Sequence, residues 1–406
     1  MEGYQLPEDL KLIREQVRRV IQEDVIPAET RIDPDESELL EADYRRIAQK
    51  VQAAGLWALG VPKRYGGGGL NTFAMCVLLE EMVQHRMGLY HPGAGVFGRP
   101  VPHSIWAGSE EQIRKYAVPA VRDGAYCFFA ITEPTGGSDP AGAIRTTAVR
   151  RGDRYVIDGT KVFISHANLA KWGVVYARTD SGAGRKGITA FIVETSTPGF
   201  QARPLRTIRT SAPANEVTFT ECEIPASQRI GEEGQGLDLA FGLLTANRFP
   251  YSAANLGIAV AAHRRAVEYA NQRSTFGAYL ADRQAIQWML ADSEMEIRAT
   301  RWLIWDGAWK SDRGEDARVE ASVAKVASSE MLGRVIDRVV QIFGGYGVSK
   351  EFPFERWYRE ARVRRIGEGP SEVHRMVIAR DLLRAGRAKR AGLERKDVKN
   401  PAPAAD

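Results

Sequence analysis

Apolar side chains recur at three- and four-residue intervals through the first part of the chain. The pattern runs over 10–21 and 40–54, and it returns over 72–87. This spacing places the apolar residues on one face of a helix. Pro27 is expected to end the first helix, and Gly55 is expected to cap the second. Helices are therefore predicted throughout this part of the chain.

The period changes to two after about residue 125. Alternating, β-branched segments occur at 154–165, 173–180, 187–195 and 215–224, and Gly, Asp and Pro separate them. Short strands without intervening helices are typical of a compact antiparallel sheet or barrel. A small β domain is therefore predicted in the middle of the chain.

The helical period returns at residue 236 and continues almost to the end. Four long helical stretches are expected, at roughly 236–271, 280–310, 316–343 and 353–385, with Gly- or Pro-containing breaks between them. Four such helices in succession are typical of a helix bundle.

These patterns predict an α+β protein with an N-terminal helical domain, a middle antiparallel β domain and a C-terminal four-helix bundle. The expected boundaries are 1–125, 126–235 and 236–390, and a basic tail follows at 391–406. A chain of 406 residues is long enough for two or three domains that each bury a core. A small ligand is expected in the crevice between the β domain and the bundle.

Composition and charge narrow the classes of function. No apolar run approaches the ~20 residues of a membrane span, and the charged N-terminus lacks a signal core, so a cytoplasmic protein is expected. Three widely spaced cysteines indicate neither a disulfide framework nor a zinc site. The basic surplus between Arg384 and Lys399 equals the net charge of +5 of the whole chain, which argues against a nucleic-acid-binding face.

Several blocks can carry chemistry. The segment 93–98 matches GxGxxG literally, but no βαβ unit surrounds it, so a Rossmann site is not expected. The block at 128–139, FFAITEPTGGSD, combines ring-walling side chains with a Gly-rich turn that exposes backbone N–H groups. The block at 158–165, DGTKVFIS, places Phe163 and Ser165 on one strand face. Taken alone, each block also fits an ordinary turn or strand.

Taken together, these blocks resemble the acyl-CoA dehydrogenase family of flavoproteins, in the family's order, from the N-terminal helices to about Arg384. ITEPTGGSD is similar to the family's TEPGAGSD signature, and DGTKVFIS is similar to its NGxKxWIT segment. RSTFG, with Gln284 beyond it, resembles RxxFG…Q. QIFGGYG resembles QxxGGxG, and GEGPSEVHR resembles YEGTxxxxR. The resemblance implies FAD as the cofactor and the same helical, β and helical order of domains.

The resemblance also implies site residues. The positions expected at the cofactor are Phe129, Ile131, Thr132, Ser138, Phe163, Ser165, Arg273, Phe276, Gln284, Gln341, Gly344, Gly345, Pro370 and Glu372. Within that set, the position of Phe163 lies beside the flavin ring and that of Ser165 near flavin N5. Arg273 and the Gln341–Gly345 segment take positions that reach the FAD of a neighbouring subunit in the family. The positions expected at the substrate are Ser138, Thr245, Arg248 and Gly369.

Glu368 takes the family's commonest position for the catalytic base. A carboxylate beside an apolar flavin and acyl chain is desolvated, which raises its pKa into a useful range for removing the α-proton of a thioester. Some family members carry the base on the first helix of the bundle, but the chain has Asn247 there, and an amide cannot act as a base. The alternative, without a catalytic role, is that Glu368 is a solvent-facing carboxylate at the start of a helix.

The function implied is α,β-dehydrogenation of an acyl-CoA thioester to a trans-2-enoyl-CoA. By resemblance, an electron-transferring flavoprotein is the expected acceptor. The resemblance also implies a homo-oligomer, with a dimer of dimers as the expected assembly. The alternatives are an acyl-CoA oxidase, an enoyl-CoA reductase or a flavin hydroxylase on the same fold, or a non-catalytic subunit. Gly367 replaces a common Tyr and is expected to leave room beside the base, and Arg99 and His103 are candidates to meet a polar acyl tail.

Overall fold

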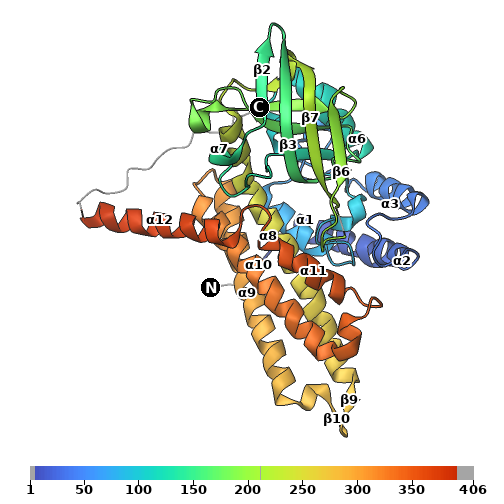
Figure 1. Cartoon of the computed structure of the whole chain (residues 1–406). Helices are drawn as coiled ribbons and strands as arrows, with labels where there is room; N and C mark the ends of the chain where they lie inside the picture. The colour runs from blue at the N-terminus through green and yellow to red at the C-terminus, as the bar shows by residue number, and fades with distance from the viewer. Residues whose placement is uncertain (1–4, 211, 391–406) are drawn as a thin grey trace. The chain divides into compact units, whose positions relative to one another are not determined.

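The computed structural model describes residues 5–210 and 212–390 (Figure 1). The chain divides into two compact units. One unit combines Met1–Leu40, Leu70–Ala94 and Thr245–Asp406, and the other combines Glu41–Gly69 and Gly95–Leu244. The helices of the first 125 residues are therefore shared between the two units.

The second unit is built on one mixed sheet that is mostly antiparallel. Its strands follow the order β6-β7-β3-β2-β4-β5-β8, and β1 pairs with β4. The strand bounds are β1 Cys127–Ala130, β2 Thr147–Arg151, β3 Arg154–Ser165, β4 Trp172–Arg178, β5 Ile188–Glu194, β6 Phe200–Pro204, β7 Ala214–Pro225 and β8 Arg229–Ile230. The predicted strands are β3, β4, β5 and β7. The β1–β4 and β2–β4 pairs are parallel, and the sequence did not indicate them.

Both faces of this sheet are buried at its centre. Val174 and Tyr176 of β4 pack with Tyr116 in one apolar cluster, while Val175 and Ala177 pack in another on the opposite face. This explains why β4 and β5 read as nearly continuous apolar runs, since strands buried on both faces lose the alternation of a half-exposed strand. The helices of this unit are α3 Glu41–Ala53, η2 Lys63–Tyr65, η4 His103–Ala107, α5 Glu110–Gln112, η5 Ile113–Ala117, α6 Val118–Asp123, α7 Pro140–Ala143, η6 Gly184–Gly187 and η7 Ala226–Gln228.

The first unit is helical. Its elements are α1 Glu8–Arg19, η1 Val20–Val25, α2 Ile26–Glu29, α4 Thr72–Met82, η3 Pro92–Gly95, α8 Gly236–Gln272, the short hairpin β9 Ser274–Thr275 and β10 Ala278–Tyr279, η8 Leu280–Asp282, α9 Gln284–Asp312, α10 Arg318–Phe343, η9 Gly344–Val348, α11 Phe354–Arg364 and α12 Ser371–Arg390. Helix α8 starts in the second unit and continues into this one. Within the described ranges, no helix is both long and apolar enough to cross a membrane.

Two sequence predictions about helices need correction. Pro27 does not end the first helix: the π-helical turn η1 precedes it, and α2 continues through it. Proline is tolerated in the first turn of a helix, and a π-turn relieves the missing i→i−4 bond. The fourth bundle stretch is two helices, because Pro370 disfavours helical backbone before it and Glu368 adopts a left-handed φ of 58°. Gly55 does cap α3 with a φ of 70°, as expected.

Candidate active site

The break between α11 and α12 carries Glu368. Glu368 and Gly369 both have left-handed backbone, with φ values of 58° and 93°. The Ser371 N–H donates to the Arg365 carbonyl at 3.1 Å and closes the loop. A left-handed φ is strained for a residue with a side chain and persists only where the surrounding contacts hold it. The loop is therefore a defined structure that presents one carboxylate between two glycines.

Two polar side chains of helix α10 form hydrogen bonds that hold this loop. The fully buried Lys325 donates from Nζ to the Arg365 carbonyl at 3.1 Å. Ser322, one turn earlier, lies 3.1 Å from Nδ1 of His374, and Nε2 of that ring lies 3.0 Å from the Glu368 carbonyl. The loop is thus attached to α10 on both sides of Gly367.

Arg364, the last residue of α11, is buried and joins that helix to α8. Its guanidinium donates to the Tyr251 carbonyl and to Oδ1 of Asn255, both at 2.6 Å. It also lies 3.3 Å from the centre of the Tyr251 ring. The Tyr251 hydroxyl lies 3.4 Å from the Arg364 carbonyl, and burial raises the pKa of that phenol well above its usual value.

The electrostatic surroundings of Glu368 are those of a desolvated carboxylate near cations. Burial raises the pKa of Glu368, and Arg248, Arg364 and Lys325 offset only part of that effect. Burial also lowers the pKa of Lys325 to about 8. Within residues 5–210 and 212–390, no group hydrogen-bonds the Glu368 carboxylate, and Nε of Arg248 is buried without a partner. Desolvation of this kind makes a carboxylate a stronger base than an exposed glutamate.

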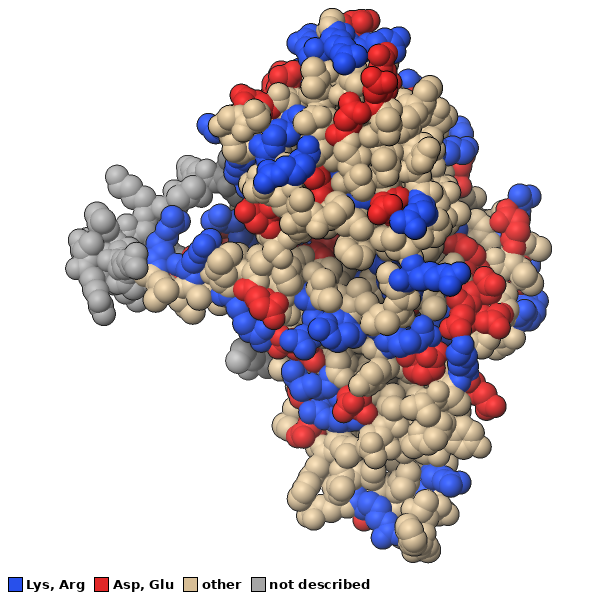
Figure 2. All heavy atoms as spheres, viewed as in Figure 1, with Lys and Arg blue, Asp and Glu red and all other residues tan. Residues whose placement is uncertain are grey.

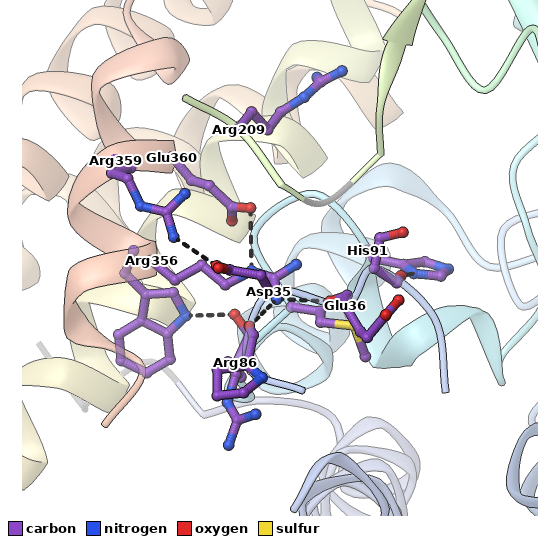
Figure 3. A network of polar contacts seen from close by, with 12 residues as sticks. Asp35, Glu36, Arg86, His91, Arg209, Arg356, Arg359 and Glu360 are labelled. Carbon is purple, nitrogen blue, oxygen red and sulfur yellow. Dashed lines mark hydrogen bonds and ion pairs between the residues drawn. The ribbon is translucent and has the colours of Figure 1, made fainter. Parts of the chain in front are cut away.

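Helix α11, which leads into the loop, is anchored at its start by a polar network (Figure 3). The buried Arg356 donates to the Pro34 and Glu36 carbonyls, each at 2.8 Å. Arg359 donates to Asp35 at 3.1 Å. Trp357 donates from Nε1 to the Arg86 carbonyl at 3.1 Å, so the helix is held to segments far away in the sequence.

In the second unit, the structure brings two predicted cofactor segments together. The Val162 N–H donates to the Thr132 carbonyl at 2.9 Å, which places 129–132 beside the end of β3. A register shift between Lys161 and Ile164 gives Phe163 a φ of 60° and leaves its side chain 63% exposed. A bulge that re-aims a side chain is common beside binding sites. Ser165 follows on the same strand and accepts a hydrogen bond from Arg209 at 3.1 Å.

A buried ion pair supports these segments. Lys161 donates from Nζ to Glu133 at 2.7 Å and to the Ile131 carbonyl at 3.3 Å. Glu133 also accepts the N–H groups of Arg145 and Thr146. Sequence analysis quoted both residues inside motifs but gave neither a role. The signal that could have identified this pair is a lysine at a position of the strand pattern where a buried side chain is expected.

A third group of predicted cofactor residues lies in the helical unit, at the bundle end that carries β9 and β10. Phe276, at the tip of the hairpin, is 100% exposed. The rings of Tyr269 and Phe343 stack at 4.1 Å, and this contact brings the hairpin at the end of α8 near the start of η9. The exposed members of this group are Arg273, Phe276, Gln284, Gln341, Gly344 and Gly345.

The remaining predicted residues fall in different places. Thr245 and Arg248 are half-buried on α8, and Gly369 is part of the Glu368 loop. Pro370 and Glu372 lie at the start of α12, where the carboxylate of Glu372 is exposed. Ser138 is also exposed, in the turn before α7. Sequence analysis missed Lys325, Arg364, His374 and Tyr251, which only tertiary packing brings to Glu368.

The structure bears on two expectations about the acyl pocket. The room beside Gly367 is taken, because a Cβ there would lie 3.0 Å from the Tyr251 hydroxyl. The Arg99 guanidinium is already engaged: it lies 4.6 Å and 4.0 Å from the ring centres of Tyr44 and Tyr126 and donates to the Gly124 carbonyl at 2.7 Å.

The whole described chain matches one family. Residues 7–124, 128–222 and 234–383 match the N-terminal, middle and C-terminal domains of acyl-CoA dehydrogenase. The chain belongs to the acyl-CoA dehydrogenase family. It is an oxidoreductase with the fold of that family, and the three matches follow the order that sequence analysis expected. Members of this family depend on FAD.

Relatives include proteins that are named as reductases or as part of a reductase complex. The chain is 36% identical over 383 residues to "3-(aryl)acrylate reductase" of Clostridium sporogenes, which covers 93% of this chain and 99% of that protein. It is 35% identical over 346 residues to "Caffeyl-CoA reductase-Etf complex subunit CarC" of Acetobacterium woodii, which covers 84% of this chain and 90% of that protein.

Solved structures agree with this family assignment. Butyryl-CoA dehydrogenase from Megasphaera elsdenii superposes with a TM-score of 0.83 at 31% identity, over 94% of this chain and all of that one (100%). A structure described as the FAD complex of PigA superposes with a TM-score of 0.84 at 25% identity, over 94% and 99% of the two chains.

The residues of this chain fit a flavin. The bulge at Phe163 leaves an aromatic ring exposed next to a strand hydroxyl and to the Gly-rich turn after Thr132. An exposed ring and convergent polar groups are what a planar, polar-edged cofactor requires. The cationic and amide side chains at the hairpin end suit its phosphates and adenine.

Proposed function

We propose that this protein removes the α-proton of an acyl-CoA thioester with Glu368 and forms a trans-2-enoyl-CoA. The observation that carries the proposal is the position of Glu368. Its carboxylate is desolvated and has no hydrogen bond from the described chain, and its pKa is raised. It lies between Gly367 and Gly369, and the missing side chains of these glycines leave room for the Tyr251 hydroxyl and the His374 ring beside the loop.

The residues of this chain supply binding and proton transfer in the proposed reaction. The α C–H bond breaks, its proton moves to the Glu368 carboxylate, and its electron pair forms the new double bond. The Glu368 N–H, in its left-handed conformation, is proposed to donate to the thioester oxygen and so make the α-proton more acidic. When bound at Phe163 and Ser165, FAD would supply the acceptor for the β-hydrogen and its electron pair.

The test is Glu368→Gln, which keeps the shape and removes the base. Turnover is expected to fall by about 10²–10⁴, with FAD content and acyl-CoA binding retained. The assay is reduction of a ferrocenium acceptor with a panel of straight-chain, branched and aryl acyl-CoA thioesters, with dioxygen as the alternative oxidant. Glu351→Gln, at an exposed carboxylate in the loop before α11, is the matched control. Near-normal turnover of Glu368→Gln would show that the base lies elsewhere.

A second candidate function is the same reaction run toward the saturated acyl-CoA. The relatives named as an arylacrylate reductase and a caffeyl-CoA reductase subunit favour it. A raised pKa also suits Glu368 to deliver a proton in this direction. Reduction of enoyl-CoA thioesters by the dithionite-reduced protein, compared with oxidation of the matching acyl-CoA, separates the two.

We also propose an electron-transferring flavoprotein as the redox partner. The support is the relative named as part of a reductase–Etf complex. The cytoplasmic location stays a prediction from the sequence.

We further propose that the chain works as a homo-oligomer, with the dimer of dimers as the expected form. Four side chains on α9 recur every seventh residue, Trp288, Met295, Trp302 and Trp309, and are 48–62% exposed. A seven-residue repeat forms one apolar stripe along a helix, the pattern by which helices pair. Figure 2 shows mostly uncharged side chains at the bundle end that carries β9 and β10. An exposed apolar stripe of this length suits burial against a second copy.

The exposed cofactor residues at the same end of the bundle support this assembly. Phe276 is 100% exposed and Arg273 is also exposed in the single chain. Residues in this position are proposed to complete the FAD site of a neighbouring subunit, as the family resemblance implies.

A further inference from the structure

The backbone of Glu368 is held by a histidine whose ring is almost completely buried. His374, on the first turns of α12, is 1% exposed. Its Nε2 lies 3.0 Å from the Glu368 carbonyl, and its Nδ1 lies 3.1 Å from the Ser322 hydroxyl. A carbonyl only accepts, so the hydrogen of the neutral ring is on Nε2.

The ring stays neutral in the folded protein. Burial lowers the pKa of His374 to about 4, although the bond to the Glu368 carbonyl acts in the opposite direction. Nδ1 is then an acceptor for the Ser322 hydroxyl on α10, in competition with the Arg318 carbonyl, which lies 3.0 Å from the same hydroxyl oxygen. The imidazole therefore connects α10 to the loop as an uncharged donor and acceptor, and it adds no charge next to the carboxylate.

The contact has a clear mechanical consequence. A Cβ at Gly369 would lie 2.9 Å from Nε2 of His374, so the ring also shapes the loop on the far side of Glu368. Without the ring, the left-handed backbone of Glu368 loses the hydrogen bond that holds its carbonyl. Left-handed backbone is strained for a residue with a side chain and persists only where contacts hold it, so the loop can relax once this bond is lost.

We propose that His374 is a positioning residue for Glu368: its Nε2–H holds the Glu368 carbonyl and thereby fixes the direction of the carboxylate. The proposal rests on the proposed role of Glu368 as the base. His374 itself is not proposed to contact the reacting atoms. It acts through the backbone of the residue that does.

Two amide substitutions of His374 isolate this hydrogen bond. His374→Gln places an amide N–H about where Nε2 was, whereas the shorter amide of His374→Asn reaches only the Nδ1 side. His374→Gln is expected to keep kcat within about threefold of wild type. His374→Asn is expected to lower kcat by about 10–100-fold, because small displacements of a catalytic group are costly. KM and FAD content should change little in either variant.

The pH dependence of kcat/KM separates a positioning role of His374 from a purely structural one, because a loss of stability alone would not shift the pKa of Glu368. The groups that face Glu368 are Arg248 and Tyr251 on α8, Lys325 on α10 and Arg364 on α11, with neutral His374 on α12. When the loop relaxes, water reaches the carboxylate and its raised pKa falls toward the usual value. The acid limb of kcat/KM is therefore expected at lower pH in His374→Asn and at its wild-type position in His374→Gln.

The assay uses the FAD-bound enzyme and the best substrate from the acyl-CoA panel, with thermal unfolding measured alongside. His263→Leu on α8, which removes a histidine paired with Glu294 away from the loop, is the control. If His374→Asn does not fold, Ser322→Ala replaces it as the test variant. This substitution removes the partner of Nδ1 and should lower kcat several-fold, and an unchanged kcat would overturn the proposal. Equal kcat and equal acid limbs in the Asn and Gln variants would overturn the proposal. An active Glu368→Gln would instead overturn the proposed function.

Discussion

Single side chains set the shape of the space next to Glu368. Gly367 has no left-handed backbone, so its conformation permits a side chain, yet the Tyr251 hydroxyl lies 3.0 Å from where its Cβ would be. A contact that short forces one of the two groups to move. The phenol of an α8 residue thus occupies room that the loop leaves open, and Tyr251 and Gly367 form a complementary pair.

Gly367→Ala should therefore impair the enzyme only while the Tyr251 oxygen is present. We expect it to lower kcat/KM by about tenfold in the wild type and by less than about threefold in a Tyr251→Phe background. The difference corresponds to a coupling of about 0.7–1.4 kcal/mol, within the usual range for residues in contact. A double-mutant cycle on kcat/KM measures it. Gly333→Ala is the control, because a Cβ there meets nothing within 4 Å. Equal losses in both backgrounds would contradict the pairing.

Helices of the first unit are joined by carboxylates that no apolar pattern reveals. Glu81 on α4 accepts hydrogen bonds from Arg14 at 2.7 Å and from Arg18 at 3.0 Å, both on α1. Its neighbour Glu80 accepts from Arg301 on α9 at 2.6 Å. One turn of α4 therefore connects two helices that are far apart in the sequence.

Glu81→Gln should weaken this connection and make the protein less sensitive to acid. Burial would raise the pKa of Glu81, but Arg18 and Arg14 outweigh it and the pKa is lowered. Such a group stabilises the fold above its unfolded pKa of about 4.3, and the contribution is lost as pH falls through the lower folded value.

We expect the variant to lose about 1–3 kcal/mol of stability at pH 7, the usual contribution of hydrogen bonds to a charged group. Its thermal midpoint should fall less steeply than that of the wild type between about pH 5 and pH 3. Thermal unfolding followed by circular dichroism at stepped pH tests both, with the exposed Glu111→Gln as control. An unchanged midpoint at pH 7 would mean that the network contributes no net stability.

The molecule as a whole carries its apolar stripe and its exposed cofactor residues on the same helical unit. The stripe runs along α9, and Arg273 and Phe276 lie in the hairpin that precedes this helix. Assembly through α9 would bury apolar surface worth about 25 cal/mol per Å². Loss of assembly is therefore expected to affect FAD retention as well as size.

Trp302→Glu should reduce the oligomer to a smaller species and lower the FAD content with it. A charge at the middle of the stripe cannot be buried against a second copy without a partner. Light scattering on a sizing column and the ratio of flavin to protein absorbance measure the two effects. Leu12→Glu on α1 introduces the same charge at a leucine that is 61% exposed and should change neither. A Trp302→Glu protein of wild-type size would rule out this interface.

The order of helices and strands was predictable because periodicity and glycine and proline preferences act over a few residues. The strands at β3, β4, β5 and β7 and the long bundle helices follow from such local signals. The break at Glu368 was harder to predict, since Pro370 and two glycines also occur at ordinary helix ends. The tail at 391–406 lies outside the described residues.

The amino-acid sequence already specifies a carboxylate between two glycines, an aromatic and a hydroxyl two residues apart on one strand, and the family to which these motifs belong. Tertiary packing decides what that carboxylate experiences. Arg248, Lys325, Arg364 and His374 reach Glu368 from four different helices, and each contact depends on how distant segments pack. Desolvation and charge act through space, so the raised pKa of Glu368 is a property of the folded chain and of no segment within it.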